Sequence, residues 1–209
     1  MQQEQQTRTD EKRTHRNVGY KNSVSRFHML TMSKCNKICN ELIKDTYRPT
    51  KGEKYEVFTP KYRVVTSSKY RDRIPQSSFI VNYFYPTVIP NLYEYNCACL
   101  KGKGTDYARE RLKVILRNAN EDDYCLKADM KGYFASIDHQ KLCDELSEYI
   151  TDPWAMHYFI QTVENAGDIG LDLGSEVYQL SATSFMNRLD HMLGDNYIRY
   201  QDDLLFIGS

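Results

Sequence analysis

Hydrophobic and polar residues follow two different periods along this chain of 209 residues, and the changes of period mark the expected elements. Over residues 22–47, apolar residues recur at the three- and four-residue spacing of one helix face, at Phe27, Leu30, Ile38, Leu42 and Ile43. The stretch KYEVFTPKYRVV instead alternates apolar and polar positions on both sides of Thr59 and Pro60. This alternation predicts a β-hairpin over residues 54–66.

The rest of the chain alternates helices with strands, and it contains no repeat. Pro86 is expected to end a helix over residues 71–84. Thr105 is the expected N-cap of a basic helix, and Asp138 is the expected N-cap of a helix over 139–149. The other predicted elements are a strand over 124–134 that turns near Gly132, a helix over 152–164, a turn at 170–174, a helix over 177–193, and strands at 197–200 and 204–208.

The composition favours a globular protein over a membrane protein. Because 41% of the residues are hydrophobic, the chain can bury a core in one unit or in two small lobes. Residues 1–20 lack hydrophobic periodicity and are rich in Gln, Arg and Thr, so we expect a disordered polar tail. No apolar run approaches the roughly 18–20 residues that span a bilayer, and the N-terminus is not signal-like. We therefore expect a cytoplasmic protein with no membrane partner.

Six cysteines raise the alternatives of a zinc site or a set of disulfides. The closest pairs have the spacings C-x3-C and C-x-C, which lack the two-residue knuckle of common zinc sites. In an intracellular compartment, reduced and mostly packed thiols are the expected state. The six positions are Cys35, Cys39, Cys97, Cys99, Cys125 and Cys143.

The net charge of zero hides a strong segregation of charge along the chain. Residues 1–73 hold 17 Lys and Arg against 8 Asp and Glu, and residues 101–117 hold 6 against 2. Residues 118–209 hold 5 against 17. A basic first part and an acidic second part suggest a polyanion bound by one lobe and cations gathered by the other. A solvated surface that segregates by chance is the simpler alternative.

Asp202 and Asp203 are adjacent between two short apolar strands, where like charges repel each other and lose hydration. Adjacent aspartates also arise by chance, and a second pair, Asp122 and Asp123, fits a solvated loop. The first pair differs because Tyr200 precedes it and an apolar strand follows it. A divalent cation is the strongest local charge that offsets such a pair, so we hypothesise a metal site there.

Four blocks of the chain resemble those of reverse transcriptases, in that family's order. YQDD resembles the Y-x-D-D box, and LKADMKGYFASIDH (126–139) resembles the first catalytic block. GLDLGSEVYQLSATSFMNRLDHML (170–193) resembles the glycine turn and helix beneath the template and the incoming nucleotide, and FTPKYRVVTSSKYRDRIPQ (58–76) resembles the fingers hairpin. The resemblance covers about residues 55–209. It is closest to bacterial enzymes of the group II intron, retron, diversity-generating and defence-associated types.

The resemblance implies an α+β fold with right-hand polymerase fingers and a partial palm, in which helices back a ferredoxin-like antiparallel sheet. The implied regions are the polar tail at 1–20, fingers at 21–105, the first part of the palm at 106–149, a helical segment between fingers and palm at 150–170, and the palm with its motif B helix and Y-x-D-D hairpin at 171–209. The family's lysine block, primer grip and thumb do not follow before Ser209. We therefore expect the front portion of a longer protein, with no thumb and with the strand at 204–208 lacking sheet neighbours.

The implied activity is RNA-directed DNA synthesis. In that reaction two magnesium ions, about 3.5–4 Å apart, activate the primer 3′-hydroxyl and neutralise the pyrophosphate. Mn²⁺ is the alternative cofactor. The resemblance makes Asp129 and Asp202 the metal-bridging pair, Asp203 an auxiliary ligand and Met130 a backbone carbonyl donor. Taken without the other blocks, Asp129 is more simply a strand-end cap or turn former.

Four further residues are implied nucleotide contacts. Lys61 and Arg63 would contact the triphosphate, Phe134 would exclude a 2′-hydroxyl and so select deoxynucleotides, and Gln179 would lie near the templating base. Each has a simpler interpretation. The hairpin cations would face solvent, Phe134 would belong to the core, and Gln179 would be an exposed helical residue.

The implied partners are an RNA template, a DNA or RNA primer, dNTPs and a structured RNA of a retroelement. Candidates for contacts with nucleic-acid phosphates are Arg71, Arg73, Lys101, Lys103 and Arg109. For Arg71 and Arg73, an internal pair with Asp72 is the alternative.

Two other function classes stay open. Asp172 occupies the glycine turn where many relatives have proline, which places a negative charge near nucleic acid. That departure favours a catalytically idle remnant that binds nucleic acid or a partner. A related palm enzyme that makes RNA, such as an RNA-directed RNA polymerase or primase, is the third class, and Phe134 argues against it.

Overall fold

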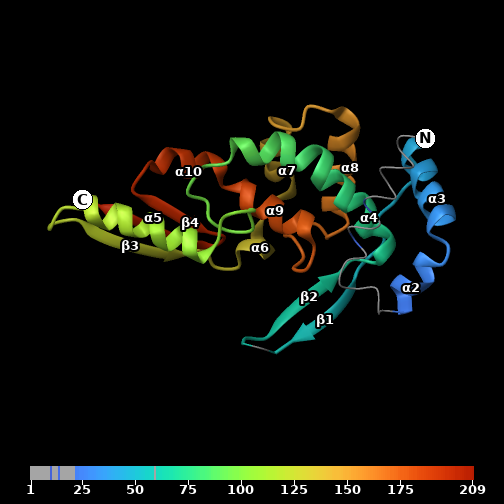
Figure 1. The fold of residues 1–209 in the computed structure, drawn as a ribbon, viewed down its shortest axis with the longest axis horizontal. Helices are drawn as coiled ribbons and strands as arrows, with labels where there is room; N and C mark the ends of the chain where they lie inside the picture. Colours follow the sequence, from blue (N-terminus) through green and yellow to red (C-terminus); the bar gives the residue numbers. More distant parts are fainter. Residues whose placement is uncertain (1–9, 11–13, 15–21, 59) are drawn as a thin grey trace.

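The computed structural model describes residues 10, 14, 22–58 and 60–209, and it combines helices with two small antiparallel sheets (Figure 1). Of residues 1–20, for which disorder was expected, only 10 and 14 are among the described residues. The expected turn residue Thr59 also lies outside the described residues. The strands are β1 (Glu53–Val57), β2 (Arg63–Ser67), β3 (Tyr124–Asp129), β4 (Tyr197–Tyr200) and β5 (Asp203–Gly208). The helices are α2 (Asn22–His28), α3 (Thr31–Ile43), α4 (Tyr70–Phe79), the π-helical η1 (Ile80–Val88), the 3₁₀ turn η2 (Ile89–Asn91), α5 (Thr105–Asn118), α6 (Tyr133–Ser136), α7 (His139–Ser147), α8 (Pro153–Glu164), α9 (Glu176–Phe185) and α10 (Asn187–Leu193).

The two sheets occupy different parts of an elongated molecule (Figure 1). Strands β1 and β2 form the predicted hairpin, with Val57 opposite Arg63 at its outer end. Strands β3, β5 and β4 form a three-stranded antiparallel sheet in that order, beside α5 and α10. The strand at 204–208 was expected to lack neighbours, and this is wrong. β5 is the central strand, because β3 and β4 both supply backbone partners to it.

The main core lies between the helices. Phe79, Phe84 and Phe159 are buried there with Leu142 and Val163, from α4, η1, α8 and α7. Burial of each such side chain contributes on the order of 1.5–3 kcal/mol. A smaller cluster joins α5 to the three-stranded sheet and contains Cys97, Ile115, Ile198 and Ile207. This second cluster fixes the sheet against α5 and leaves the sheet end at Asp129 accessible.

Side-chain caps explain where two helices begin. The predicted cap Asp138 is confirmed, because its Oδ1 accepts from the Lys141 N–H at 2.9 Å. Asp152 caps α8 in the same way, accepting from the Ala155 N–H at 2.9 Å. The Thr105 cap is wrong, since α5 starts at Thr105 and the N-cap is Gly104, with no side-chain cap bond.

Two predicted helices are divided. The helix expected over 22–47 breaks between α2 and α3 at Leu30, whose φ and ψ are −125° and 29°. The helix expected over 177–193 breaks at Met186 (φ −100°, ψ 14°). Just before that break, the hydroxyls of Thr183 and Ser184 donate to backbone carbonyls of their own helix. Such bonds compete with the helical ladder and often bend helices.

Two predicted boundaries also differ. The strand expected to reach residue 134 ends at Asp129, because Gly132 takes a left-handed conformation (φ 64°) and the short α6 follows. Pro86 does not end a helix. α4 ends at Phe79, and the chain continues through Pro86 as the π-helical η1, which extends to Val88.

Among the described residues, no disulfide joins any of the six cysteines. Cys35 and Cys97 are buried, whereas Cys99 and Cys125 are exposed, so packing of the thiols is not general. Among the described residues, no helix combines the length and apolar character needed to cross a membrane.

Candidate active site

The turn between β4 and β5 carries the acidic pair. Tyr200 pairs with Asp203, so Gln201 and Asp202 alone form the turn. Gln201 has φ 58°, a left-handed conformation that costs a non-glycine residue about 1–2 kcal/mol. Its side-chain Nε2 donates to Thr183 Oγ1 and to Cys99 Sγ, each at 2.9 Å. These bonds hold a strained turn in one geometry.

Asp129 meets this turn from the neighbouring strand. β3 ends at Asp129, which lies directly opposite Asp203 in the sheet, so the two side chains share one face. The next residue, Met130, donates its N–H to the Asp202 carbonyl at 3.0 Å. Two acidic segments far apart in the sequence are therefore brought to the same end of the sheet by backbone pairing.

A cleft of about 510 Å³ joins these carboxylates to the β1–β2 hairpin. Its wall contains the predicted acidic residues and the two predicted hairpin cations. One lining cation, Lys127, was not predicted from the sequence. The lining residues are Lys61, Arg63, Lys127, Ala128, Asp129, Asp202 and Asp203. The cleft thus places three carboxylates and three cations around one volume.

The oxygen donors of the cleft fit Mg²⁺ in kind. The carboxylates are hard ligands of the type that magnesium prefers, whereas Met130, the predicted carbonyl donor, does not line the cleft. Among the described residues, neither Asp129 nor Asp202 has a cation within ion-pair distance. No three His, Cys, Asp or Glu side chains in the described part of the chain lie close enough together to hold an ion. The carboxylates would have to draw together around a metal.

Asp203 differs from the other two carboxylates because Lys127 approaches it. Lys127 Nζ lies 3.9 Å from Asp203 Oδ1, and both side chains are more than half exposed. An exposed ion pair of this length contributes about 0–1 kcal/mol, so it yields easily to a stronger cation. The geometry therefore leaves Asp203 available as a supporting ligand.

Phe134 and Gln179 lie outside the lining of the cleft. Phe134 is half-buried against the helical core and meets Tyr133 edge to face, with ring centroids 5.8 Å apart. The Tyr133 hydroxyl donates to the Ala182 carbonyl at 2.6 Å. Burial raises the pKa of Tyr133, and so it keeps this proton. Gln179 is exposed on α9.

Arg71 and Arg73 have partners within the protein, but Asp72 is not one of them. Arg71 pairs with Glu41 and lies over the Tyr47 ring. Arg73 donates to the Ser68 carbonyl at 3.0 Å and to Ser67 Oγ at 2.7 Å. The predicted internal pair with Asp72 is therefore wrong.

Asp72 instead fastens the loop before β1 to α4. Its carboxylate is buried and accepts from the Tyr47 hydroxyl at 2.7 Å and from the Thr50 N–H at 3.2 Å. These hydrogen bonds satisfy the Asp72 carboxylate without an ion pair to either neighbouring arginine.

The other three candidate cations lie at the start of α5. Lys103 Nζ donates to the Glu94 carbonyl and lies 5.5 Å from the centre of the Tyr107 ring. Desolvation lowers the pKa of Lys103. Arg109 pairs with Asp106 at 3.2 Å on an exposed helix surface. Lys101 is exposed. None of the three lines the cleft.

Comparison with solved structures identifies a related fold. A chain from the structure of apo telomerase from Candida tropicalis, truncated from its C-terminal domain, superposes with a TM-score of 0.53 at 13% sequence identity. The match covers 85% of this chain and 49% of that chain. The protein has a polymerase-like fold. It spans about half the length of the structure it matches. No family model and no curated protein sequence matches the chain.

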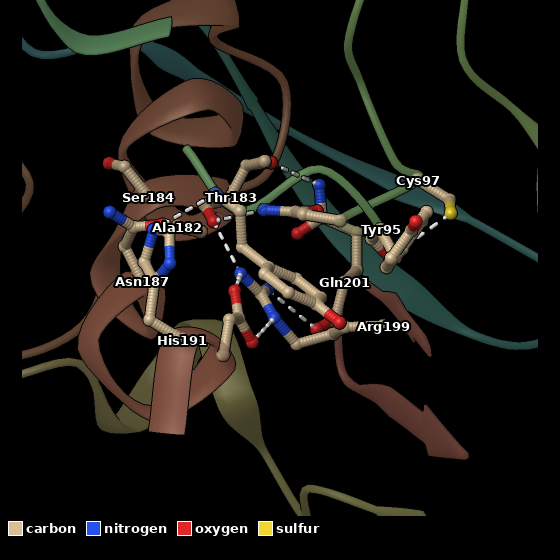
Figure 2. Close-up of polar contacts among 12 residues, drawn as sticks. Tyr95, Cys97, Ala182, Thr183, Ser184, Asn187, His191, Arg199 and Gln201 are labelled. Carbon is tan, nitrogen blue, oxygen red and sulfur yellow. Dashed lines mark hydrogen bonds and ion pairs between the residues drawn. The ribbon is translucent and has the colours of Figure 1, made fainter. Parts of the chain in front are cut away.

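Beneath the acidic turn, a buried ion pair that was not predicted from the sequence joins α10 to β4 of the polymerase-like fold. Arg199 and Asp190 are both fully buried and lie 2.6 Å apart. Figure 2 shows the Arg199 guanidinium reaching from β4 towards Thr183 and Gln201. One signal was present in the sequence. In YIRY, a charged residue shares its strand face with Tyr197, at a position where a buried strand normally has an apolar side chain.

Proposed function

We propose that this protein is an RNA-directed DNA polymerase that adds deoxynucleotides to a primer 3′-hydroxyl. The observation that carries the proposal is the cleft, where Asp129, Asp202 and Asp203 face Lys61 and Arg63. A nucleotidyl transferase needs both features at one point, since cations must hold a triphosphate and carboxylates must hold metal ions. The polymerase-like fold, shared with a telomerase, supports the proposal.

The cations of the hairpin and the carboxylates of the cleft have different tasks in this proposal. Arg63 binds triphosphate oxygens as a planar bidentate donor, and Lys61 adds a point charge. Asp129 and Asp202 would hold two Mg²⁺ ions, with Asp203 and the Met130 carbonyl in support, and Mn²⁺ would serve in their place. Bound ions would supply an activated primer hydroxyl and neutralisation of the leaving pyrophosphate. The rigid turn at Gln201 keeps Asp202 from moving away during the reaction.

The proposed substrates follow from the proposed polymerase activity. We propose an RNA template, a DNA or RNA primer and dNTPs, in an enzyme of the bacterial kind that works in the cytoplasm, with a retroelement RNA as a further partner. Phe134 is proposed to select deoxyribose. It is half-buried rather than in the wall of the cleft, so this role requires a bound nucleotide to approach it.

Primer extension on an RNA template tests the proposal. We expect the wild-type protein to add dNTPs, and Asp202→Ala to abolish addition. Asp122→Ala is the matched control, because it removes the exposed aspartate of the other adjacent pair, in the loop before β3. If Asp202→Ala extends primers as well as the wild type, the proposed metal ligands are wrong.

Phe134→Ala should admit rNTPs, and unchanged sugar selectivity would remove Phe134 from the site.

The second candidate is a nucleic-acid-binding protein without catalysis. It is favoured by the absence, among the described residues, of a three-carboxylate cluster ready to hold a metal, and by Asp172 in the glycine turn. A wild-type protein that retains RNA in a filter-binding assay but never extends a primer, with either Mg²⁺ or Mn²⁺, would establish this candidate instead.

A further inference from the structure

The guanidinium of Arg199 joins three segments of the chain beneath the acidic turn (Figure 2). Nε and Nη2 donate to the two carboxylate oxygens of Asp190 in α10, at 2.7 and 2.6 Å. Nη2 also donates to the Thr183 carbonyl in α9 at 2.6 Å, and Nη1 donates to the Gln201 carbonyl at 3.1 Å. All three nitrogens are therefore used, and one of them is bonded to the turn itself.

The network is more extensive than an ion pair needs. Asp190 Oδ1 also accepts from the Tyr197 hydroxyl at 3.1 Å, and the Thr183 carbonyl also accepts from Asn96 Nδ2 at 2.9 Å. Burial acts to lower the pKa of Arg199, but the hydrogen bonds and charge of Asp190 outweigh it and raise that pKa. The guanidinium thus stays charged inside the protein.

A stabilising role does not explain why these charges are buried. Replacing a buried ion pair by apolar residues of similar size is often neutral or stabilising, because both charges lose their hydration. Apolar residues could fill the same space, but they could not donate to the carbonyl of Gln201. The bond to the turn is the contact that requires an arginine.

We propose that Arg199, oriented by Asp190, is a positioning residue that holds the Gln201–Asp202 turn so that Asp202 faces Asp129. The link to Asp129 is direct, because the Asp202 carbonyl accepts the N–H of Met130, the residue after Asp129. Thr183 adds a second link, since its hydroxyl accepts from the Gln201 side chain. The consequence for catalysis rests on the proposed function, whereas the effect on the turn does not.

The test replaces both charges together, with Arg199→Met and Asp190→Leu in one variant. Loss of one partner alone would leave an uncompensated buried charge, whereas the double variant leaves none. Arg117→Met is the matched control, because Arg117 is an exposed arginine of α5, the helix that packs on the same sheet. Thermal unfolding checks that each variant is folded.

Two readouts separate positioning from mere stability. Hydrogen exchange of the Met130 amide, followed by NMR, should be about tenfold faster in the double variant, while the Thr66 amide, bonded to the Leu173 carbonyl, stays at the wild-type rate. In primer extension, kcat should fall by about ten- to a hundredfold with little change in KM for dNTP, because a small misplacement of a reacting group is costly. Arg117→Met should change neither.

A folded double variant with wild-type Met130 exchange and wild-type kcat would overturn the proposal. If the double variant does not fold, Arg199→Lys decides by the same readouts, since lysine keeps the charge but cannot reach Asp190, Thr183 and Gln201 together. If the wild-type protein never extends a primer, the proposed function fails. Faster exchange at Met130 would still support the positioning of the turn, and unchanged exchange would refute it.

Discussion

Gln201 holds a backbone conformation that glutamine rarely adopts, and its neighbours account for it. A hairpin turn with φ near 58° usually has glycine or asparagine at this position. Here the side chain is bonded to Thr183 and Cys99, and the carbonyl to Arg199. Strain that persists only because the surroundings enforce it is common at functional sites. At the scale of single residues, the candidate site is therefore defined as much by the supports of the turn as by its aspartates.

Burial makes Cys97 differ sharply from the exposed cysteines. Desolvation raises the pKa of Cys97 to about 11, so roughly one thiol in a thousand is ionised at pH 8. We expect iodoacetamide at pH 8 to label Cys125, which is exposed, and to leave Cys97 unlabelled in the folded protein. Peptide mass spectrometry measures both positions in one sample. Equal labelling of the two would show that the cluster beneath α5 opens readily.

At the scale of elements, the glycine turn before α9 fastens the hairpin to the helical core. The Leu173 carbonyl accepts from the Thr66 N–H of β2 at 2.7 Å. Gly174 has φ 116°, and a Cβ there would lie 2.7 Å from the Thr66 carbonyl oxygen and 2.7 Å from Val65 Cγ1. This close approach holds β2, and with it Arg63, in place above the carboxylates.

Gly174→Ala should therefore displace the hairpin. We expect a loss of about 1–3 kcal/mol in the free energy of unfolding and a fall in Tm of roughly 3–10 °C, because both the left-handed backbone and the contact with β2 become strained. Gly102→Ala is the control, since Gly102 also has positive φ (78°) but nothing lies within 4 Å of its Cβ position. The control should cost only about 1 kcal/mol. Equal Tm values for the two variants would contradict the contact.

The cations of the hairpin are not equivalent. Lys61 and Arg63 line the cleft, whereas Lys54 lies on β1 outside the lining. Replacing Lys61 and Arg63 by alanine should raise KM for dNTP by about tenfold or more, because charge-assisted bonds to the triphosphate are lost. Lys54→Ala should leave KM unchanged. Steady-state primer extension measures both, and equal effects would indicate general attraction of anions rather than a site.

At the scale of the whole molecule, basic and acidic parts that are separate in the sequence lie side by side in space. The basic hairpin and the acidic end of the three-stranded sheet face one cleft, although each belongs to a different part of the chain. In the proposed function, the cations would bind the triphosphate beside the carboxylates that would hold the metal ions, as transfer of a nucleotide requires.

Local patterns predicted the hairpin, the two final strands and the Asp138 cap, because alternation and capping are encoded within a few residues. They did not predict the central position of β5 or the break at Met186. The first depends on β3, a partner distant in sequence, and the second accompanies hydroxyl bonds of Thr183 and Ser184 to their own helix, which apolar spacing does not reveal. Arg199 was missed because its partner Asp190 lies in a different element, α10, which spacing along one strand does not reveal.

The central claim is that Asp129 and Asp202 act as one unit. A double-mutant cycle of single-turnover primer extension with Asp129→Asn, Asp202→Asn and both together tests it most directly. Residues that act together show losses that do not add, so each single variant should lower the rate by about a hundredfold or more and the double variant should be no slower. Wild-type rates in either single variant, or losses that multiply in the double variant, would contradict the account.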